Sequence, residues 1–255
     1  MRVEPYGIGS VVHVVKRGAR GMDIVNDEAD RWRFVRLLYL LNDTHQPRNN
    51  ARVRKSDLHT RIQDDIEGDA SQTCTSASAS FFERPDHWPE RDPLVAILGW
   101  TLMPNHLHLL IQEIRAGGIS KFTQRLFGSM SSAHNQKYNE KGSIFQGSFR
   151  GKTVDTDEYM RYVFPYVVVK NVLELYPEGL ESAVNNFDKA WKWAATDPFS
   201  SCRTAAHGDR SPIIDHDHLV DLGLLGKNFK QDARDMLSGH MHTREDFSAL
   251  MLEDW

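Results

Sequence analysis

The chain has 255 residues, enough for one large domain with or without an appendage, and its 40% hydrophobic and 26% charged residues are ordinary for a globular protein. No apolar run approaches the ~20 residues of a membrane span, and the N-terminal MRVEPYGIGS lacks the pattern of a secretory signal. Cys74 and Cys202 have no metal-type spacing, so the composition argues against a disulfide framework and favours a cytoplasmic protein.

The net charge of -4 hides a basic middle segment. Residues 94–154 hold seven Lys or Arg against two Glu, whereas residues 177–255 hold fourteen acidic residues against eight basic ones. Charge alone favours an ordinary solvated surface. A nucleic-acid partner nevertheless needs only a local positive potential, so the middle segment stays a candidate for one.

The first third of the chain predicts a strand, a helix and an insertion. Residues 10–15 (SVVHVV) are a β-branched run, which is typical of a strand. Asn26 and Asp27 can cap a helix whose apolar residues recur up to Leu41. The polar stretch Asn42–Pro93 has weak periodicity, so we expect an insertion that is partly a mobile loop.

The remaining elements predict a sheet with helices. They are a strand at Leu94–Met103, a turn at Pro104–Asn105, a strand at His106–Gln112, a helix near Ser120–Tyr138, an extended segment at Ile144–Val154, and a helix after Asp155–Asp157 that Pro165 must kink. This order predicts an α+β fold, a ferredoxin-like antiparallel sheet of about four strands with helices packed on one face. Residues 1–180 would form the main domain, with the insertion at about 42–93, and residues 181–255 an accessory segment.

His106 and His108 form the motif with the clearest chemistry. Side chains two apart in a strand point to the same face about 7 Å apart, so two imidazoles so placed can bind one divalent ion. The motif alone leaves a metal site and structural histidines about equally favoured. His216/His218 and His240/His242 have the same spacing, but in polar sequence where strand alternation does not apply, so we expect no site role for them.

Several motifs in order resemble one family. Residues 99–110 (GWTLMPNHLHLL) closely resemble the signature of the REP-associated tyrosine transposases, a branch of the single-tyrosine HUH transposases. Residues 13–18 (HVVKRG), 144–150 (IFQGSFR) and 159–171 (YMRYVFPYVVVKN) resemble further family segments. The resemblance covers roughly Tyr6–Leu180 apart from the insertion, and more weakly residues 191–203.

The resemblance implies an endonuclease and transposase that cleaves and rejoins single-stranded DNA. Tyr166 would be the nucleophile, His106 and His108 would hold Mg²⁺ or Mn²⁺, and the product would be a 5′-phosphotyrosine link with a free 3′-OH. Imidazoles favour Mn²⁺ over Mg²⁺. The partner would be hairpin-forming repeats, bound by a monomer or homodimer. Tyr159 and Tyr162 share a helix face with Tyr166, and we expect them to pack against the sheet.

The sequence departs from the family at one position of the implied site. Relatives carry an amide residue one turn after the tyrosine, whereas this chain has Lys170 there, followed by Asn171. A protonated lysine cannot ligate a metal. Three interpretations remain: Asn171 reaches the ion because Pro165 shifts the helix, water fills the place, or Lys170 contacts a DNA phosphate.

Candidate DNA contacts are basic or amide residues, among which the Lys16–Arg20 and Arg150–Lys152 groups stand out because they lie at strand ends beside the implied site. They are Lys16, Arg17, Arg20, Lys121, Arg125, Gln146, Arg150, Lys152 and Lys170. Two other functions stay open. A domesticated protein would bind DNA hairpins without cutting them, and a metal-dependent hydrolase would use water as its nucleophile and form no covalent adduct.

Overall fold

A computed structural model describes residues 6–45, 79–84, 88–226 and 228–242. Four strands form one sheet: β1 (Val11–Arg17), β2 (Val95–Leu102), β3 (His106–Glu113) and β4 (Arg150–Val154). Their order is β2-β3-β1-β4, and every neighbouring pair is antiparallel. The predicted α+β class and four-stranded antiparallel sheet are confirmed, and β3 is an interior strand.

The strand register brings the sequence motifs together on one face of the sheet. His108 lies opposite Val15 of β1 and Thr101 of β2, while His106 lies opposite Arg17. On the other side of β1, Arg150 pairs with Val15 and Lys152 with His13. Directly opposed residues point to the same face, so this face, called here the histidine face, gathers imidazoles and basic side chains in adjacent rows.

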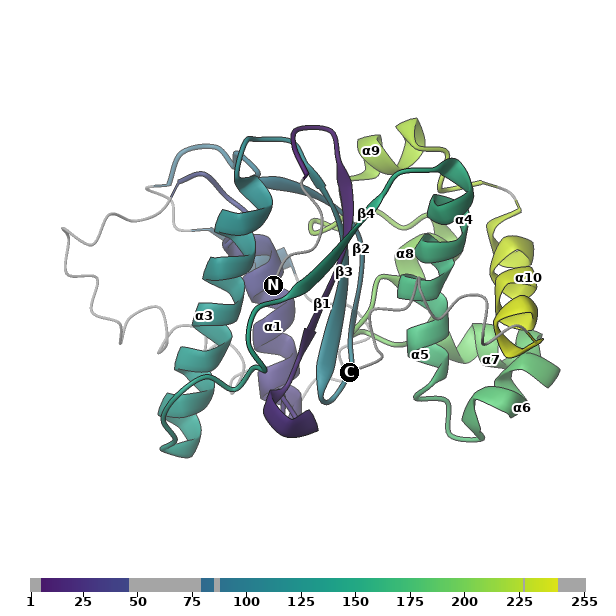
Figure 1. Cartoon of the computed structure of the whole chain (residues 1–255), viewed down its shortest axis with the longest axis horizontal. Helices are drawn as coiled ribbons and strands as arrows, with labels where there is room; N and C mark the ends of the chain where they lie inside the picture. The colour runs from purple at the N-terminus through teal and green to yellow at the C-terminus, as the bar shows by residue number, and fades with distance from the viewer. Residues whose placement is uncertain (1–5, 46–78, 85–87, 227, 243–255) are drawn as a thin grey trace.

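Helices cover both faces of the sheet, which corrects the expectation that they pack on one face. In Figure 1, α1 (Glu28–Leu40) and α3 (Gly118–Tyr138) lie on one side of the sheet. The helices after β4 lie on the other side (Figure 1). Every residue of β2 is buried. A continuously apolar strand such as β2 needs cover on both faces.

The polypeptide on the histidine face begins with three consecutive helical segments. These are α4 (Asp157–Pro165), the π-helical turn η3 (Tyr166–Lys170) and α5 (Asn171–Leu173). The side chain of Thr156, within the Asp155–Asp157 segment after which a helix is expected, accepts a hydrogen bond from Tyr159 N and caps the helix. The π turn directly follows Pro165, where the sequence predicts a kink.

The C-terminal part adds five helices and closes the edge of β2. They are α6 (Gly179–Asn185), α7 (Phe187–Ala194), α8 (Cys202–His207), α9 (His216–Asp221) and α10 (Phe229–His242). Leu102 N donates to Phe199 O at 3.0 Å, and Asp215 N donates to Ile97 O at 2.9 Å. These bonds occupy backbone groups that an edge strand would otherwise expose. None of the helices in the described ranges is long and apolar enough to span a membrane.

The ends of the expected insertion are fixed to the start of β2. The buried Asn42 side chain donates to Val95 O at 2.8 Å and accepts from the backbone N–H groups of Leu94 and Val95, each at 3.0 Å. The short helix η2 (Ala79–Phe82) lies outside the sheet, as expected for the insertion. The loop predicted to be mobile falls mainly on residues 46–78, which lie outside the described residues.

Candidate active site

His106 and His108 lie side by side on the histidine face of β3. Their ring centroids are 5.0 Å apart. His108 is fully buried, His106 is partly exposed, and the Nε2 atom of each ring is buried. Because β3 is paired on both sides, the backbone holds the two imidazoles in fixed positions.

A neighbouring side chain orients each imidazole through Nδ1. His106 Nδ1 lies 2.7 Å from Asn105 Oδ1, whose amide nitrogen donates to Gly21 O. An amide oxygen only accepts, so His106 carries its proton on Nδ1 and keeps a lone pair on Nε2. His108 Nδ1 lies 3.0 Å from His13 Nε2, and the two rings stack at 5.3 Å. Metal-binding histidines are commonly oriented in this way.

Tyr166 lies over the same two histidines. Its ring meets His13 and His108 edge-on, with centroids 6.0 Å from each, and it stacks on Tyr162 at 5.8 Å. The side chain is only 2% exposed. The phenol oxygen lies 3.4 Å from Lys170 Nζ, which donates to it. The structure therefore brings the predicted nucleophile and the predicted metal ligands into one cluster.

Because of the π turn, Asn171 rather than Lys170 lies one turn below Tyr166 along the helix axis. In an α-helix the fifth residue would lie roughly 140° further around the axis. Here Asn171 N donates to Tyr166 O, the i→i+5 bond of a π turn, which brings Asn171 beneath Tyr166. Thr101 Oγ1, in the row of His108, donates to Val167 O at 2.6 Å and fixes the turn against the sheet.

Gly99 permits this close approach of η3 to β2. A Cβ atom at Gly99 would lie 2.7 Å from Val168 Cγ1, closer than real Cβ contacts allow. A side chain at this position would therefore push η3 away from the histidine face. Gly99 belongs to the run GWTLMPNHLHLL that carries the family resemblance. By leaving room for η3, it gives this run a structural role in addition to that of the two histidines.

Asn171 and Lys170 have different environments. Asn171 is fully buried, and within the described residues neither Oδ1 nor Nδ2 has a hydrogen-bond partner. A buried amide without partners is costly, which is typical of a group that awaits a ligand. Lys170 is 2% exposed, pairs with Glu174 at 2.6 Å and lies over the Tyr166 ring at 4.6 Å. Its charge is thus partly balanced inside the protein.

The side chains present fit a divalent ion. Two oriented imidazoles each direct a buried Nε2 away from the anchoring contact, and Asn171 offers an amide oxygen, a hard ligand of the kind Mg²⁺ and Mn²⁺ accept. No cluster of three or more His, Cys, Asp or Glu residues suited to a metal occurs in the described part of the chain. The fit therefore depends on the amide as the third protein ligand.

Helix α10 covers the tyrosine, and it brings a histidine that sequence reasoning missed. His240 is 5% exposed; its Nδ1 lies 3.1 Å from the Tyr162 hydroxyl, and its ring meets Tyr166 edge-on at 5.9 Å. We expected no site role for the His240/His242 pair. Its position here comes from the packing of α10 on α4 and η3, which no local sequence pattern reveals.

The predicted DNA contacts divide between the two faces of the sheet. Arg17, Arg150 and Lys152 are partly exposed on the histidine face, and Arg20 and Gln146 are exposed in turns near its edge. Lys121 and Arg125 belong to α3 on the opposite face, where Arg125 donates to Asp43 O.

Lys16 is a correction to the predicted DNA contacts. Its ammonium is buried on the face opposite the histidines, donates to Gly147 O at 2.5 Å, and lies 5.1 Å from the ring centroids of both Phe127 and Phe145. Burial lowers its pKa to about 8. Strand alternation places neighbours Lys16 and Arg17 on opposite faces, so only Arg17 stays available to a ligand on the histidine face.

A family model matches the centre of the chain. Residues 90–169 match the family described as "Transposase IS200 like". This range includes β2, β3, α3, β4, α4 and all of η3 except Lys170, and with them His106, His108 and Tyr166. Residues 90–169 are similar to IS200-like transposases. The family resemblance predicted from the sequence is therefore confirmed for the part of the chain that carries its main motifs.

The likeness of this chain to solved structures and curated proteins is weaker. The solved structure titled "Structure of the REP associates tyrosine transposase bound to a REP hairpin" is 13% identical, with a TM-score of 0.37, covering 84% of this chain and 90% of that one. At this TM-score the overall likeness carries no argument, and the fold rests on the strand order and register. No curated protein matches the chain.

Proposed function

We propose that the protein is a DNA transposase that cleaves and rejoins single-stranded DNA through Tyr166. The observation that supports this most strongly is the cluster of Tyr166, His106 and His108 on one face of the sheet within residues 90–169. The cluster places a phenol nucleophile beside two oriented imidazoles that could hold an activating metal ion, an arrangement suited to covalent phosphoryl transfer. The proposed domain of residues 1–180 contains all three side chains.

Tyr166 would attack the scissile phosphorus through its phenol oxygen. The new bond joins tyrosine to the 5′ phosphate, the bond to the 3′ oxygen breaks, and that oxygen takes up a proton to become a free 3′-OH. Tyr162, stacked on Tyr166, and the π turn hold the phenol ring over the histidine face. Attack by a 3′-OH on the same phosphorus reverses the step and rejoins DNA.

His106 and His108 would hold Mg²⁺ or Mn²⁺ through Nε2, with Asn171 as the third ligand. When bound, such an ion would polarise the scissile phosphate and favour the phenolate form of the nucleophile. Asn105 and His13 keep Nε2 of the two histidines available by engaging Nδ1. Lys170, whose charge Glu174 partly balances, donates to the phenol oxygen but supplies no metal ligand.

Access of DNA to the Tyr166 hydroxyl requires α10 to move. Tyr166 is 2% exposed, and His240 of α10 contacts both Tyr162 and Tyr166. A buried cluster of this kind also favours the second candidate function, a domesticated protein that binds hairpins without cutting them, as does Lys170 in place of the family's amide.

Incubation with hairpin-bearing single-stranded DNA and Mn²⁺, followed by a denaturing gel, distinguishes a cleaving transposase from a protein that only binds hairpins. A covalent adduct supports the transposase, and cut DNA without an adduct would indicate a hydrolase that uses water.

DNA binding is expected to depend on the basic side chains of the histidine face. Arg150→Glu with Lys152→Glu should weaken binding to all single-stranded sequences alike, by at least about tenfold, and should reduce the steep loss of affinity with salt, because fewer counterions are released. Lys121→Glu, on α3 at the opposite face, is the matched control and should change affinity little. Equal losses in both proteins, measured by fluorescence anisotropy, would contradict a binding surface on this face.

Asn171 and Lys170 are expected to respond differently to substitution. Asn171→Ala should lower Mn²⁺ affinity and cleavage by at least about tenfold, since it removes a proposed ligand. Lys170→Asn should leave cleavage unchanged or raise it, because Lys170 supplies no ligand. Titration calorimetry with Mn²⁺ separates metal loss from catalytic loss. Normal Mn²⁺ affinity in Asn171→Ala would exclude Asn171 as a ligand, and a fall in cleavage in Lys170→Asn would show that Lys170 has its own role.

A further inference from the structure

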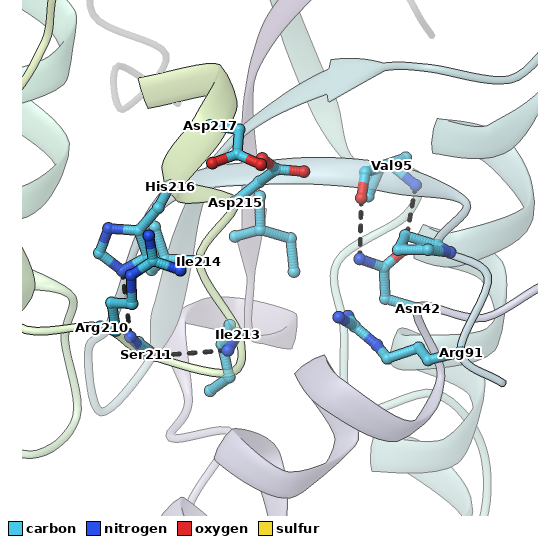
Figure 2. Close-up of a pocket in the computed structure, with 12 residues that line it drawn as sticks. Asn42, Arg91, Val95, Arg210, Ser211, Ile213, Ile214, Asp215, His216 and Asp217 are labelled. Atoms are coloured by element: carbon cyan, nitrogen blue, oxygen red, sulfur yellow. Dashed lines mark hydrogen bonds between the residues drawn. The ribbon is translucent and has the colours of Figure 1, made fainter. Parts of the chain in front are cut away.

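A cavity lies at the end of β2 that is far from His106, His108 and Tyr166. The cavity, of about 250 Å³, opens between the start of β2 and the segment that leads into α9. Figure 2 shows Arg91 on one side of it and Arg210, beside His216, on the other, with Asp215 and Asp217 along another edge. Val95 and Ile97 of the lining lie six and four residues from Thr101, which pairs with His108, so along β2 the cavity lies roughly 13–20 Å from the histidines.

Arg91 is a cation that forms no ion pair with a carboxylate among the described residues, although the charges of Asp43 and Asp215 raise its pKa. Among the described residues it makes one hydrogen bond, at 3.5 Å to Pro212 O, and lies over the Tyr39 ring at 4.6 Å. Its Nε is buried without an acceptor in that part of the chain, and no carboxylate forms an ion pair with it. Burial lowers the pKa of Arg91, and Tyr39 and Asp43 partly offset this effect. A desolvated guanidinium left this way is costly unless an anion joins it.

The rest of the lining defines what kind of anion fits. Arg210 is exposed and has no ion pair within the described ranges, so it offers a second guanidinium. Ile213 and Ile214 are buried and give an apolar wall. His216 Nε2 accepts from Ser211 N at 3.1 Å and thereby holds the loop that carries Arg210. Two guanidiniums beside an apolar wall suit a compact ligand with a charged end and an organic end.

We propose that this cavity binds a small ligand bearing a terminal phosphate, of nucleoside-monophosphate size, with the phosphate between Arg91 and Arg210. Guanidinium groups bind phosphate oxygens through paired N–H donors. The volume admits one such group with an organic moiety against the isoleucine wall. Asp217, exposed at the rim, disfavours a longer polyanion and offers an acceptor to an amino or hydroxyl group. The proposal does not depend on Tyr166 chemistry.

Calorimetric titration of the full chain with AMP, adenosine and inorganic phosphate tests this site. AMP should bind, adenosine should bind at least about tenfold more weakly because it lacks the charged end, and Arg210→Gln should weaken AMP binding by a similar factor. Arg91→Gln should weaken AMP binding as well. Because Arg210 is exposed, its substitution tests the site without disturbing buried structure. Arg203→Gln, an exposed arginine outside the cavity, is the matched control and should bind AMP normally.

Several outcomes would overturn the site. They are no AMP binding at millimolar concentration, equal binding of adenosine and AMP, or equal weakening by Arg203→Gln and Arg210→Gln. A 5′-phosphorylated dinucleotide that competes with AMP as strongly as AMP itself would assign the terminal phosphate to a DNA strand end. Absence of competition would assign it to a free nucleotide. Either result sustains the phosphate site.

Discussion

Tyr166→Phe is expected to abolish the covalent protein–DNA adduct while leaving DNA affinity within about twofold. The change removes the attacking oxygen but keeps the ring that packs against His13, His108 and Tyr162. The adduct is measured on a denaturing gel with labelled hairpin DNA and Mn²⁺, and affinity by anisotropy. Loss of a nucleophile is not rescued by metal, so raising Mn²⁺ should restore nothing.

Tyr162→Phe is the matched control for this experiment. Tyr162 stacks on Tyr166, and its hydroxyl lies 3.1 Å from His240 Nδ1. Loss of this hydroxyl should preserve the adduct, because the attacking oxygen is untouched. Adducts that persist in Tyr166→Phe but disappear in Tyr162→Phe would show that Tyr162 is the nucleophile. In that case Tyr166 would be the supporting ring and Tyr162 the attacking one.

His108→Ala is expected to reduce cleavage by at least about 100-fold through loss of Mn²⁺. His108 is fully buried between His13 and Tyr166, so a thermal unfolding measurement must accompany the assay. Excess Mn²⁺ should partly restore cleavage, because the remaining ligands stay in place. Mn²⁺ binding, followed by titration calorimetry, should fall in parallel.

His218→Ala and His13→Asn make the histidine experiment specific. His218 belongs to a His-x-His pair in α9, away from the cluster, and its loss should leave Mn²⁺ affinity unchanged. His13→Asn removes the ring that engages His108 Nδ1, and we expect a loss of Mn²⁺ affinity of about tenfold. Unchanged Mn²⁺ affinity in a folded His108→Ala protein would contradict a metal site at the histidines.

Strand alternation and motif order made much of the site predictable. The run GWTLMPNHLHLL predicts a hairpin with both histidines on one face, and the structure has β2, a turn and β3 there, with that face shared. The Pro165 kink was predicted because proline lacks an N–H. The π turn that follows depends on the contact of Val167 O with Thr101 and on Gly99, which are tertiary interactions.

Other features depended on packing between distant segments. Lys16 and Arg17 are neighbours in one basic group of the sequence, although strand alternation alone separates them to opposite faces. The continuous apolar run of β2 also indicated cover on both faces, which the expected one-sided arrangement overlooked. The contact of His240 with Tyr166 could not be predicted, because 73 residues lie between them in the sequence and only the packed fold joins them.

Mass spectrometry of the adducted protein is the most direct test of the central claim. The 255-residue chain is incubated with hairpin-bearing single-stranded DNA and Mn²⁺ and digested with nuclease and protease, and its peptides are searched for one that carries a nucleotide 5′ phosphate. We expect the modification on Tyr166, in the peptide that contains YVFPYVVVK, and a free 3′-OH on the released strand. A modification on another residue, or cleaved DNA with both ends free of protein, would contradict Tyr166 as the nucleophile.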